Sequence, residues 1–551
     1  MVRTHLSLIL SLFILGACAS KMKDQMKEYR AQYAQGDYTK AKTLLEKSEL
    51  PKDNKSLLLY KMEQGTTALA LENYDDAIYA FQAALGLIDE LYTTKLSSKA
   101  ASFLVNDASD VFYGANYERS YAHYFLSKAL YGRYKKTGNK LDLQGARATI
   151  LAWDTYFTDL QRSASSKTLY QTDLMLKIFG GQIHEVSEIR NDKQIALQLY
   201  KDGLKILDSQ GGIFKLFNSN NEKYIKAFES AVKSEKPAPT KEFEKTSGYE
   251  DLKDFLHYKI LDLTKEIRSG DFAAQVKSLK PSEAVLKKVE SKANVVLVIE
   301  EGLIPQKIGK PFNFGLKGAM DAVDNPTAKK FIATVGRDAI ALFAMNTLGM
   351  TPGASAGPGS FLFGYEATKL AVQEAAIEFE LPMIDTIPVV GRMEVFILNK
   401  EGKILKHSPL PVISDNGDIA RVVLEEDAVS RYVKTGSRVA VRQIIAIVAA
   451  MQIYKKLNGG EGNIFASTAA MAAYVGASKG IAALEKADTR HWTTLPQALR
   501  MMEFQLKPGT YQVGVGLYTG EAAPKQAAKI LGDIVVDQSS KSIHTFKFIN
   551  P

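Results

Sequence analysis

Apolar residues recur at intervals of three and four positions along the first half of the chain. The interval holds from residue 21 to about residue 267, with few runs of β-branched residues. This periodicity is typical of amphipathic helices that follow one another. We therefore predict helix after helix in this half, including a pair over residues 117–134 and 141–160 and a further helix that carries Ala196 and Tyr200.

Four residues in this helical half match the pattern of a tetratricopeptide unit. With Gly65 at the eighth position of the unit, Ala77, Phe81 and Ala84 fall where the repeat has a small, an aromatic and a small residue. Small residues let two antiparallel helices approach closely, and the aromatic ring fills the space beside them. Residues 73–76 are expected to form the turn between the two helices.

The same turn recurs upstream. Residues 36–41 repeat it, with Leu45 in the place of the aromatic residue, and the two turns are separated by close to the ~34 residues of the repeat. We predict a degenerate, tetratricopeptide-like helical domain over residues 18–232. An irregular helical bundle with chance matches is the alternative. Either form offers an extended surface for binding another protein.

The composition changes after residue 232. Residues 233–248 are rich in Ser, Lys, Glu and Pro, as in Lys236-Pro237-Ala238-Pro239, which is typical of a linker or a domain edge. Helical periodicity resumes over about residues 249–268. We assign residues 233–292 to a linker that contains this helix, and residues 293–551 to a mixed α/β domain.

Apolar runs in the last part of the chain predict strands as well as helices. Residues 295–299 form a continuous run typical of a buried strand, and residues 393–398 and 511–518 are further strand candidates. The helix candidates are residues 328–348, 417–432, 437–457 and 464–486. The apolar run at 444–451 is much shorter than the ~20 residues of a membrane span. The expected fold class is therefore α+β and multi-domain, with a tetratricopeptide-like helical domain followed by a mixed α/β half.

The first twenty residues have the layout of an export signal. Arg3 precedes an apolar run over residues 6–16, which is too short to cross a bilayer as a helix. The run ends in Leu15-Gly16-Ala17-Cys18, which resembles the lipobox of bacterial lipoproteins. We expect residues 1–17 to be a cleaved signal peptide and Cys18 to be lipidated. The alternative is a cysteine within an ordinary signal or an uncleaved anchor.

Cys18 is the only cysteine of the chain, so the mature protein is expected to have neither a disulfide nor a free thiol. Several acyl chains on one residue give stable membrane attachment. Ala19 and Ser20 follow, with no Asp at the first position, which by analogy with enterobacterial sorting favours the outer membrane. The expected location is the cell envelope, facing the periplasm.

Composition and charge narrow the class of protein further. The 551 residues include 46% hydrophobic residues, enough for more than one core, and 24% charged residues, so long disordered tracts are not expected. The net charge of +9, from 70 basic and 61 acidic residues, is thin for a chain of this size. It gives no reason to expect a nucleic-acid partner.

A segment near the C-terminus resembles a family signature. Residues 487–496 read Ala-Asp-Thr-Arg-His-Trp-Thr-Thr-Leu-Pro, similar to the ADTRxWxTLP signature of a little-characterised family of bacterial lipoproteins with tetratricopeptide-like N-terminal halves. Relatives are sometimes encoded near lipoproteins that activate penicillin-binding proteins. Residues 117–119, 295–305 and 437–457 agree with the resemblance, whereas the weak first repeat and an apparent insertion at 352–359 depart from it. The resemblance implies a location and an architecture, and supplies no catalytic residues.

The signature can also be interpreted physically, as a structural motif of Asp488, Arg490, Trp492 and Pro496. An Asp–Arg pair is suited to closing a corner between a helix and a strand, and the large indole is suited to the core. A ligand site is the alternative interpretation of these residues.

Residues that could carry catalysis or bind a metal lack the necessary spacing. No two of the seven histidines lie three or four positions apart, which excludes a His-Glu-x-x-His zinc site. The glycine-rich residues 353–364 lack the Gly-Lys-Ser/Thr ending of a phosphate loop, and a Gly-x-Ser-x-Gly elbow is missing. We therefore expect no metal, no cofactor and no catalytic residue. His491 is the best single candidate for a base, with packing as its alternative role.

Together these observations favour a protein that is not an enzyme. We expect a lipid-tethered scaffold or adaptor for a periplasmic protein complex, such as the machinery of cell-wall synthesis, secretion or motility. The alternative is an enzyme that acts on peptidoglycan or another envelope polymer, using His491 or a carboxylate of the second half. A small-ligand-binding module in the α/β half is a third hypothesis.

Overall fold

The computed structural model describes part of the chain. The described residues are 21–97, 110–162, 170, 172–187, 189–208, 249–315, 376–385, 392–426, 435, 477, 481, 485–518, 524–537 and 541–549. The predicted signal peptide, Cys18, the stretch 233–248, the helix candidates 328–348 and 437–457, nearly all of the candidate 464–486, and the glycine-rich residues 353–364 lie outside them.

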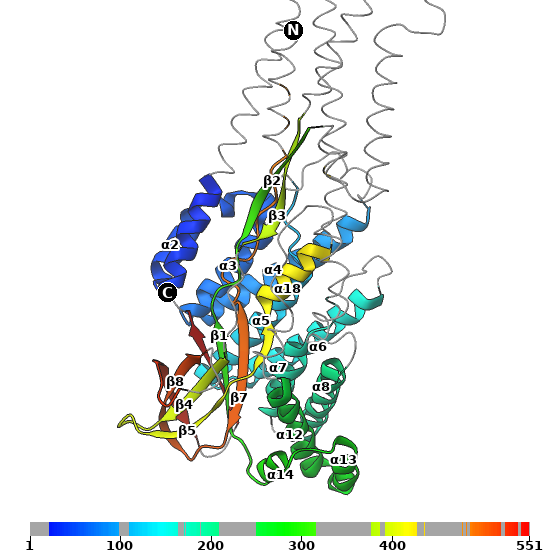
Figure 1. The fold of residues 1–551 in the computed structure, drawn as a ribbon, viewed down its shortest axis with the longest axis vertical. Coiled ribbons are helices and arrows are strands. Elements are labelled where there is room, and N and C mark those ends of the chain that lie inside the picture. The colour runs from blue at the N-terminus through cyan, green and yellow to red at the C-terminus, as the bar shows by residue number, and fades with distance from the viewer. Residues whose placement is uncertain are drawn as a thin grey trace, which may run out of the picture.

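The chain is a mixture of helix and sheet, with helices in the N-terminal region and strands towards the C-terminus (Figure 1). The helices are residues 21–34, α2 (Tyr38–Lys47), η1 (Leu50–Lys52), η2 (Asn54–Ser56), α3 (Leu57–Ala70), α4 (Tyr74–Ser97), α5 (Asn116–Thr137), α6 (Lys140–Arg162), α7 (Leu174–Glu185), α8 (Arg190–Asp208), α12 (Tyr249–Ile267), η6 (Ser269–Asp271), α13 (Phe272–Leu279), α14 (Glu283–Val289) and α18 (Asn416–Glu426). The strands are β1 (Val295–Glu301), β2 (Lys307–Gly315), β3 (Ala376–Ile384), β4 (Arg392–Leu398), β5 (Ile404–Pro409), β6 (Val412–Asp415), β7 (Ala498–Phe504), β8 (Gly509–Tyr518), β9 (Lys529–Val536) and β10 (Ser542–Phe548).

Successive helices pack as pairs, because the connections between them are short. The pairs are α3 with α4, α5 with α6, and α7 with α8, and α12 packs against α8. Asn73 precedes α4, where its side-chain oxygen accepts a hydrogen bond from the Asp76 N–H, as is typical of a helix N-terminus. Gly138 ends α5 with a φ of +73°, a left-handed conformation that glycine adopts without strain.

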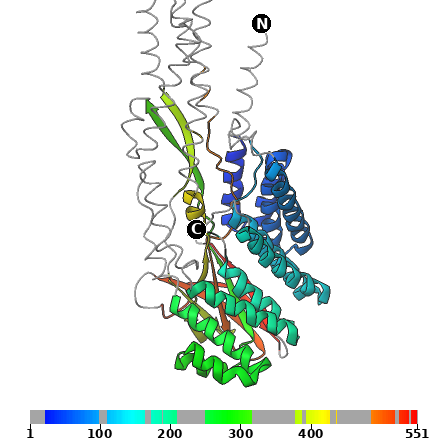
Figure 2. The ribbon, with the colours of Figure 1, turned by 90° about the vertical axis from the view of Figure 1, so that its right-hand side faces the viewer.

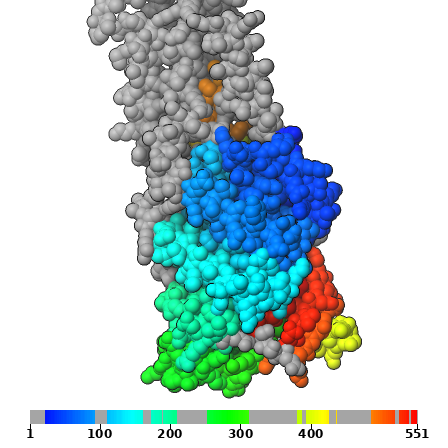
Figure 3. Space-filling view, turned by 180° about the vertical axis from the view of Figure 1, so that it is seen from behind, coloured from blue at the N-terminus to red at the C-terminus, as the bar shows by residue number. Residues whose placement is uncertain are grey.

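The helices form two layers that differ in burial. The first helix of each pair (α3, α5 and α7, the inner layer) is buried on nearly every side. The second helix of each pair (α4, α6 and α8, the outer layer) keeps a polar face towards solvent. Figure 3 shows the helical side of the molecule in chain order, from blue through cyan to green.

The strands form two four-stranded sheets and a ribbon. The first sheet has the order β10-β1-β7-β6, with β1 parallel to β10 and antiparallel to β7. The second sheet, β5-β4-β8-β9, is antiparallel throughout. The β2–β3 ribbon extends away from the two sheets, as two views at right angles show (Figure 1, Figure 2).

Strand β1 lies at the centre of the fold because both of its faces are covered. Val296 and Val298 belong to a hydrophobic cluster that they share with the helices. Val295, Leu297 and Ile299 alternate with them and pack against the second sheet. The continuous apolar run in the sequence is explained by this double burial, and the predicted buried strand is confirmed.

The helices and the first sheet share one core. A single cluster of buried residues extends from Tyr29 near the N-terminus, through the inner layer, to Trp492 and Ile543. The predicted domain boundaries stay predictions, but the hydrophobic core does not stop at residue 293.

Several predicted elements are confirmed. Residues 249–268, 393–398 and 511–518 correspond to α12, β4 and β8, and the candidate helix at 417–432 begins as α18. The sequence did not predict the strands β2, β3, β5, β6, β7, β9 and β10, or the helices α13 and α14. Among the residues that the structure describes, no helix is both long enough and apolar enough to cross a membrane.

Candidate functional site

The signature lies between the inner layer and the first sheet. Residues 488–497, here called the corner segment, lead directly into β7. The N–H of Ile304 donates to the carbonyl of Leu495 at 2.7 Å, and the side-chain amide of Asn416 donates to the carbonyl of Pro496 at 2.9 Å. The corner segment is therefore hydrogen-bonded to residues that follow β1 and β6.

Glu63 on α3 holds the corner segment from the helical side. Its carboxylate, which is fully buried, accepts hydrogen bonds from the backbone N–H and the hydroxyl of Thr493 at 2.6 and 2.7 Å. The hydroxyls of Thr494 and Tyr29 donate to its second oxygen. Burial raises the pKa of Glu63, and the hydrogen bonds from the two threonines and Tyr29 oppose that rise.

Trp492 fills the core between two helix pairs. Its side chain is fully buried, with the indole 6.0 Å from the Phe81 ring on α4 and 5.2 Å from the Phe125 ring on α5, measured between centroids. Its backbone N–H donates to Glu118 at 2.7 Å, while the other oxygen of Glu118 accepts the Ala115 N–H at the start of α5. One buried carboxylate therefore caps a helix and fixes the corner segment.

Asp488 and Arg490 form the ion pair that the signature predicted. The guanidinium donates from Nε and Nη2 to the two carboxylate oxygens at 2.9 and 2.8 Å. It also donates to the carbonyl of Asp110 at 2.9 Å and to the hydroxyl of Ser56 at 3.2 Å. Besides closing the turn, the pair ties the corner segment to residues that precede α3 and α5.

His491, the candidate base, lies in a buried position that does not suit a catalytic base. The ring is buried, and its Nδ1 lies 2.9 Å from the Thr489 carbonyl oxygen. Burial, followed by the nearby cations Lys307 and Arg30, lowers the pKa of His491 to about 3. A base works best with a pKa near the working pH, so this geometry favours the packing role.

Two buried clusters of charge lie between the helices and the first sheet, and sequence reasoning missed both. In the larger one, Lys259 on α12 and Lys541 each contact both Glu185 on α7 and Glu503 on β7, at 2.6 to 3.1 Å. Burial alone would raise the pKa of Glu503, but the two lysines outweigh burial and lower it to about 2. The four residues come from distant parts of the chain, so no local spacing in the sequence could reveal them.

The smaller cluster joins α5 to β1 and β10. Glu300 accepts hydrogen bonds from Lys128 at 2.6 Å and from Tyr124 at 3.0 Å, and Lys547 lies 3.9 Å away. Burial lowers the pKa of Lys547 to about 8, although Glu300 opposes this. In both clusters each carboxylate is paired with lysines of the same chain, which is typical of structural ion pairs.

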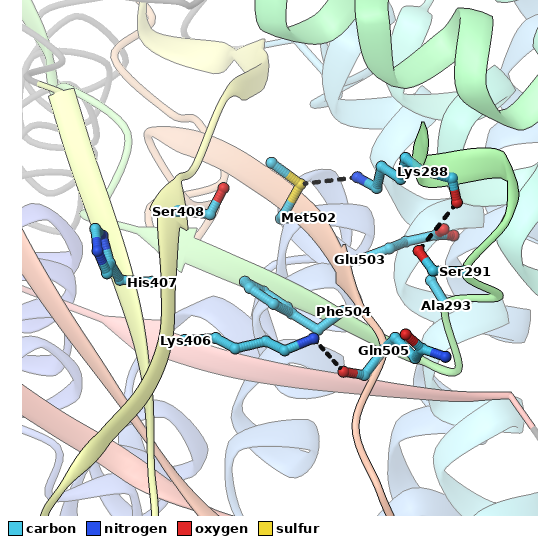
Figure 4. A pocket seen from close by; sticks show the side chains of 10 residues that line it. All are labelled: Lys288, Ser291, Ala293, Lys406, His407, Ser408, Met502, Glu503, Phe504 and Gln505. Atoms are coloured by element: carbon cyan, nitrogen blue, oxygen red, sulfur yellow. Dashed lines mark hydrogen bonds between the residues drawn. The ribbon is translucent and has the colours of Figure 1, made fainter. Parts of the chain in front are cut away.

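An open cleft of about 430 Å³ lies at one end of the first sheet, where β7 approaches α14 and β5 (Figure 4). Lys288 and Ser291 line it from α14 and the residues that follow, and Lys406 and Ser408 line it from β5. Glu503 of the larger charge cluster also contributes to its wall. The signature residues are not part of this cleft.

No protein-family model, no curated protein and no solved structure matches the chain. The family resemblance of residues 487–496 therefore stays a prediction. Within the described ranges, no group of three or more His, Cys, Asp or Glu side chains is arranged to hold a metal ion.

Proposed function

We propose that the protein is a lipoprotein scaffold of the bacterial cell envelope. In this proposal Cys18 carries the lipid that anchors the chain, in the outer membrane and facing the periplasm, and the folded body holds a periplasmic protein partner. The sequence Leu15-Gly16-Ala17-Cys18 supports the tether. The internal contacts of the signature residues count against a catalytic role for those residues, because they hold the fold together.

We further propose that the helix pairs are tetratricopeptide-like. A Cβ atom on Gly65 would lie only 2.5–2.8 Å from the Phe81 ring, so glycine is needed where α3 and α4 cross. Ala77 and Ala84 are fully buried on the same side of α4. In the α7–α8 pair a Cβ on Gly181 would likewise overlap the Tyr200 ring. The recurrence of a glycine facing an aromatic ring is what a repeat predicts.

The way in which the inner layer is covered decides which surface a partner can use. In an open helical solenoid a concave surface is free to bind a partner. Here the inner layer is covered by the corner segment and the first sheet of the same chain, as the buried Glu63–Thr493 and Tyr124–Glu300 contacts show. A partner therefore has the outer layer available to it.

The observation that carries the scaffold proposal is that exposed apolar side chains lie on or beside each helix of the outer layer. Leu141 and Leu151 on α6 are 71% and 48% exposed, Tyr79 on α4 is 66% exposed, and Ile189 before α8 is 55% exposed. Apolar side chains of this size on consecutive outer helices suit the contact area of a protein partner.

Two measurements test the proposal. Intact mass spectrometry and membrane fractionation of the native protein, beside Cys18→Ala, should show an acylated N-terminal Cys18 in the outer-membrane fraction and an unlipidated variant outside it. A photo-crosslinking residue at Leu151 should then give a discrete protein adduct in cells, which is lost in Cys18→Ala and when the crosslinker replaces the exposed Leu286 on α14 instead. An unlipidated native chain, or adducts that are equal at both positions, would contradict the proposal.

A further inference from the structure

We propose that the cleft between α14, β5 and the end of β7 binds a small ligand through an oxyanion, a carboxylate or a phosphate, held between the ammonium groups of Lys288 and Lys406. The inference does not depend on the lipid tether or on a protein partner.

Lys288 is a cation without a carboxylate partner. The residue is half-buried, and its ammonium group lies 4.8 Å from the centre of the Tyr258 ring and 4.0 Å from the sulfur of Met502. No carboxylate of the described residues lies within ion-pair distance of it. Burial lowers the pKa of Lys288, although the more distant carboxylates of Glu503 and Asp254 oppose this. An ammonium group that has given up part of its hydration without forming a direct ion pair gains free energy when an anion binds to it.

Glu503 attracts Lys288 only from beyond ion-pair distance. Its carboxylate is already contacted by Lys259 and Lys541, and those two lysines also neutralise Glu185. Lys288 lies at the edge of this cluster, outside ion-pair distance of its carboxylates. The residues that line the cleft include two lysines and one glutamate, so the lysines outnumber the carboxylate.

The opposite wall adds a second cation and a free hydroxyl. Lys406 and Ser408 alternate with His407 on β5 and so point to the same face of the strand, and in the close-up His407 lies apart from the rest of the lining (Figure 4). The Lys406 ammonium donates to the Gln505 carbonyl at 2.6 Å, which leaves two of its protons for a ligand. The half-buried Ser408 hydroxyl has no hydrogen-bond partner among the described residues.

The apolar lining and the volume of the cleft indicate the size and character of the rest of the ligand. Ala293 and Phe504 line it beside the charged groups, and the volume of about 430 Å³ is that of a small-molecule site. The cleft thus combines two cations, a hydroxyl donor and an apolar wall, a combination that suits a small organic acid or phosphate ester, or the acidic end of a chain.

The test uses the full chain in detergent with succinate and inorganic phosphate as separate probes, titrated against chloride at constant ionic strength while thermal unfolding is followed. We expect a saturable rise in Tm with at least one probe. The probe that gives it distinguishes a carboxylate from a phosphate ligand. Lys288→Met and Lys406→Met should weaken the apparent affinity at least about tenfold, since each removes a charge-assisted hydrogen bond.

Lys287→Met is the matched control. Lys287 is the neighbour of Lys288 on α14, is 75% exposed, and pairs with Glu283 at 2.8 Å, so this variant changes net charge equally without touching the cleft. It should respond like the unaltered protein. Lys406 is exposed, so its replacement keeps the fold even if Lys288→Met does not. No saturable response to either probe, or an equal response in all variants, would overturn the proposal.

Discussion

The Glu63 carboxylate on α3 accepts both the backbone N–H and the hydroxyl of Thr493, at 2.6 and 2.7 Å, from a residue 430 positions later in the chain. Both residues are buried. Since buried polar groups that lose their partners are costly, this contact makes the position of the corner segment depend on the inner layer. The helical region and the first sheet are thereby expected to fold as one body.

Glu63→Ala should destabilise the protein by at least about 3 kcal/mol, because it leaves the Thr493 N–H and several hydroxyls buried without an acceptor. Glu63→Gln should cost much less. The amide oxygen can still accept from Thr493, and the hydroxyls of Thr494 and Tyr29 can turn to accept from the amide nitrogen. Urea unfolding of the two variants checks this order, and equal losses would contradict it.

Arg490→Lys should destabilise by roughly 1–3 kcal/mol although it keeps the charge. A lysine cannot reproduce the two parallel hydrogen bonds to Asp488 while also reaching the Asp110 carbonyl. Asp488→Asn should show a similar loss, and the double variant should lose less than the sum of the two. If both single variants kept full stability, the corner segment would not depend on this pair and a ligand role for it would gain support.

The sequence predicted the type of structure that the corner segment forms, but not the residues that it contacts. The Asp–Arg pair two positions apart and the scarcity of Trp indicated a closed turn and a buried ring, and both are present. Its partners Glu63 and Glu118 could not be inferred, because nothing in helical periodicity marks a glutamate that is buried on α3 or α5. A glutamate at such a position is read as a solvated residue until the facing segment is known.

His491 should make stability depend on pH. Its folded pKa of about 3 lies below its ordinary value of 6.5, so the unfolded chain binds a proton first as the pH falls. Stability is therefore complete above about pH 7 and decreases as the pH falls from about 6.5 towards 3, by about 2 kcal/mol at pH 5. His491→Asn, which keeps a donor for the Thr489 carbonyl, should remove this part of the pH dependence. An unchanged profile of unfolding free energy against pH would contradict the burial of a neutral ring.

Glu503 should dominate the response to stronger acid. Its pKa falls from an ordinary 4.5 to about 2 on folding, so its contribution is complete above about pH 5 and is lost as the pH falls through about 2. Glu503→Gln should cost about 3 kcal/mol at pH 7 and flatten the stability profile between pH 5 and 2. Glu283→Gln on exposed α14 is the control and should cost less than about 1 kcal/mol. Equal effects of the two changes would mean that the buried cluster contributes no more than a surface pair.

The sequence predicted the helices and strands whose apolar residues follow a single regular pattern. The outer helices α4, α6 and α8 follow the three-and-four spacing of a helix with one buried face, and β1 follows a continuous apolar run because both its faces are covered. Strands such as β5 and β9 were missed because they lie at sheet edges with exposed, mixed side chains. The pairing of β10 beside β1 was also beyond the sequence, since it joins segments about 250 residues apart.

The measurement that tests the central claim most directly is hydrogen exchange of the native chain, followed by mass spectrometry across a series of urea concentrations below the unfolding transition. If the corner segment fastens the inner layer to the first sheet, peptides from α3, from residues 488–497 and from β1 should reach the same opening free energy and respond to urea alike. If the peptide with Trp492 and Thr493 opened at lower urea while α3 and β1 stayed protected, the two parts would be separate units and the account would be contradicted.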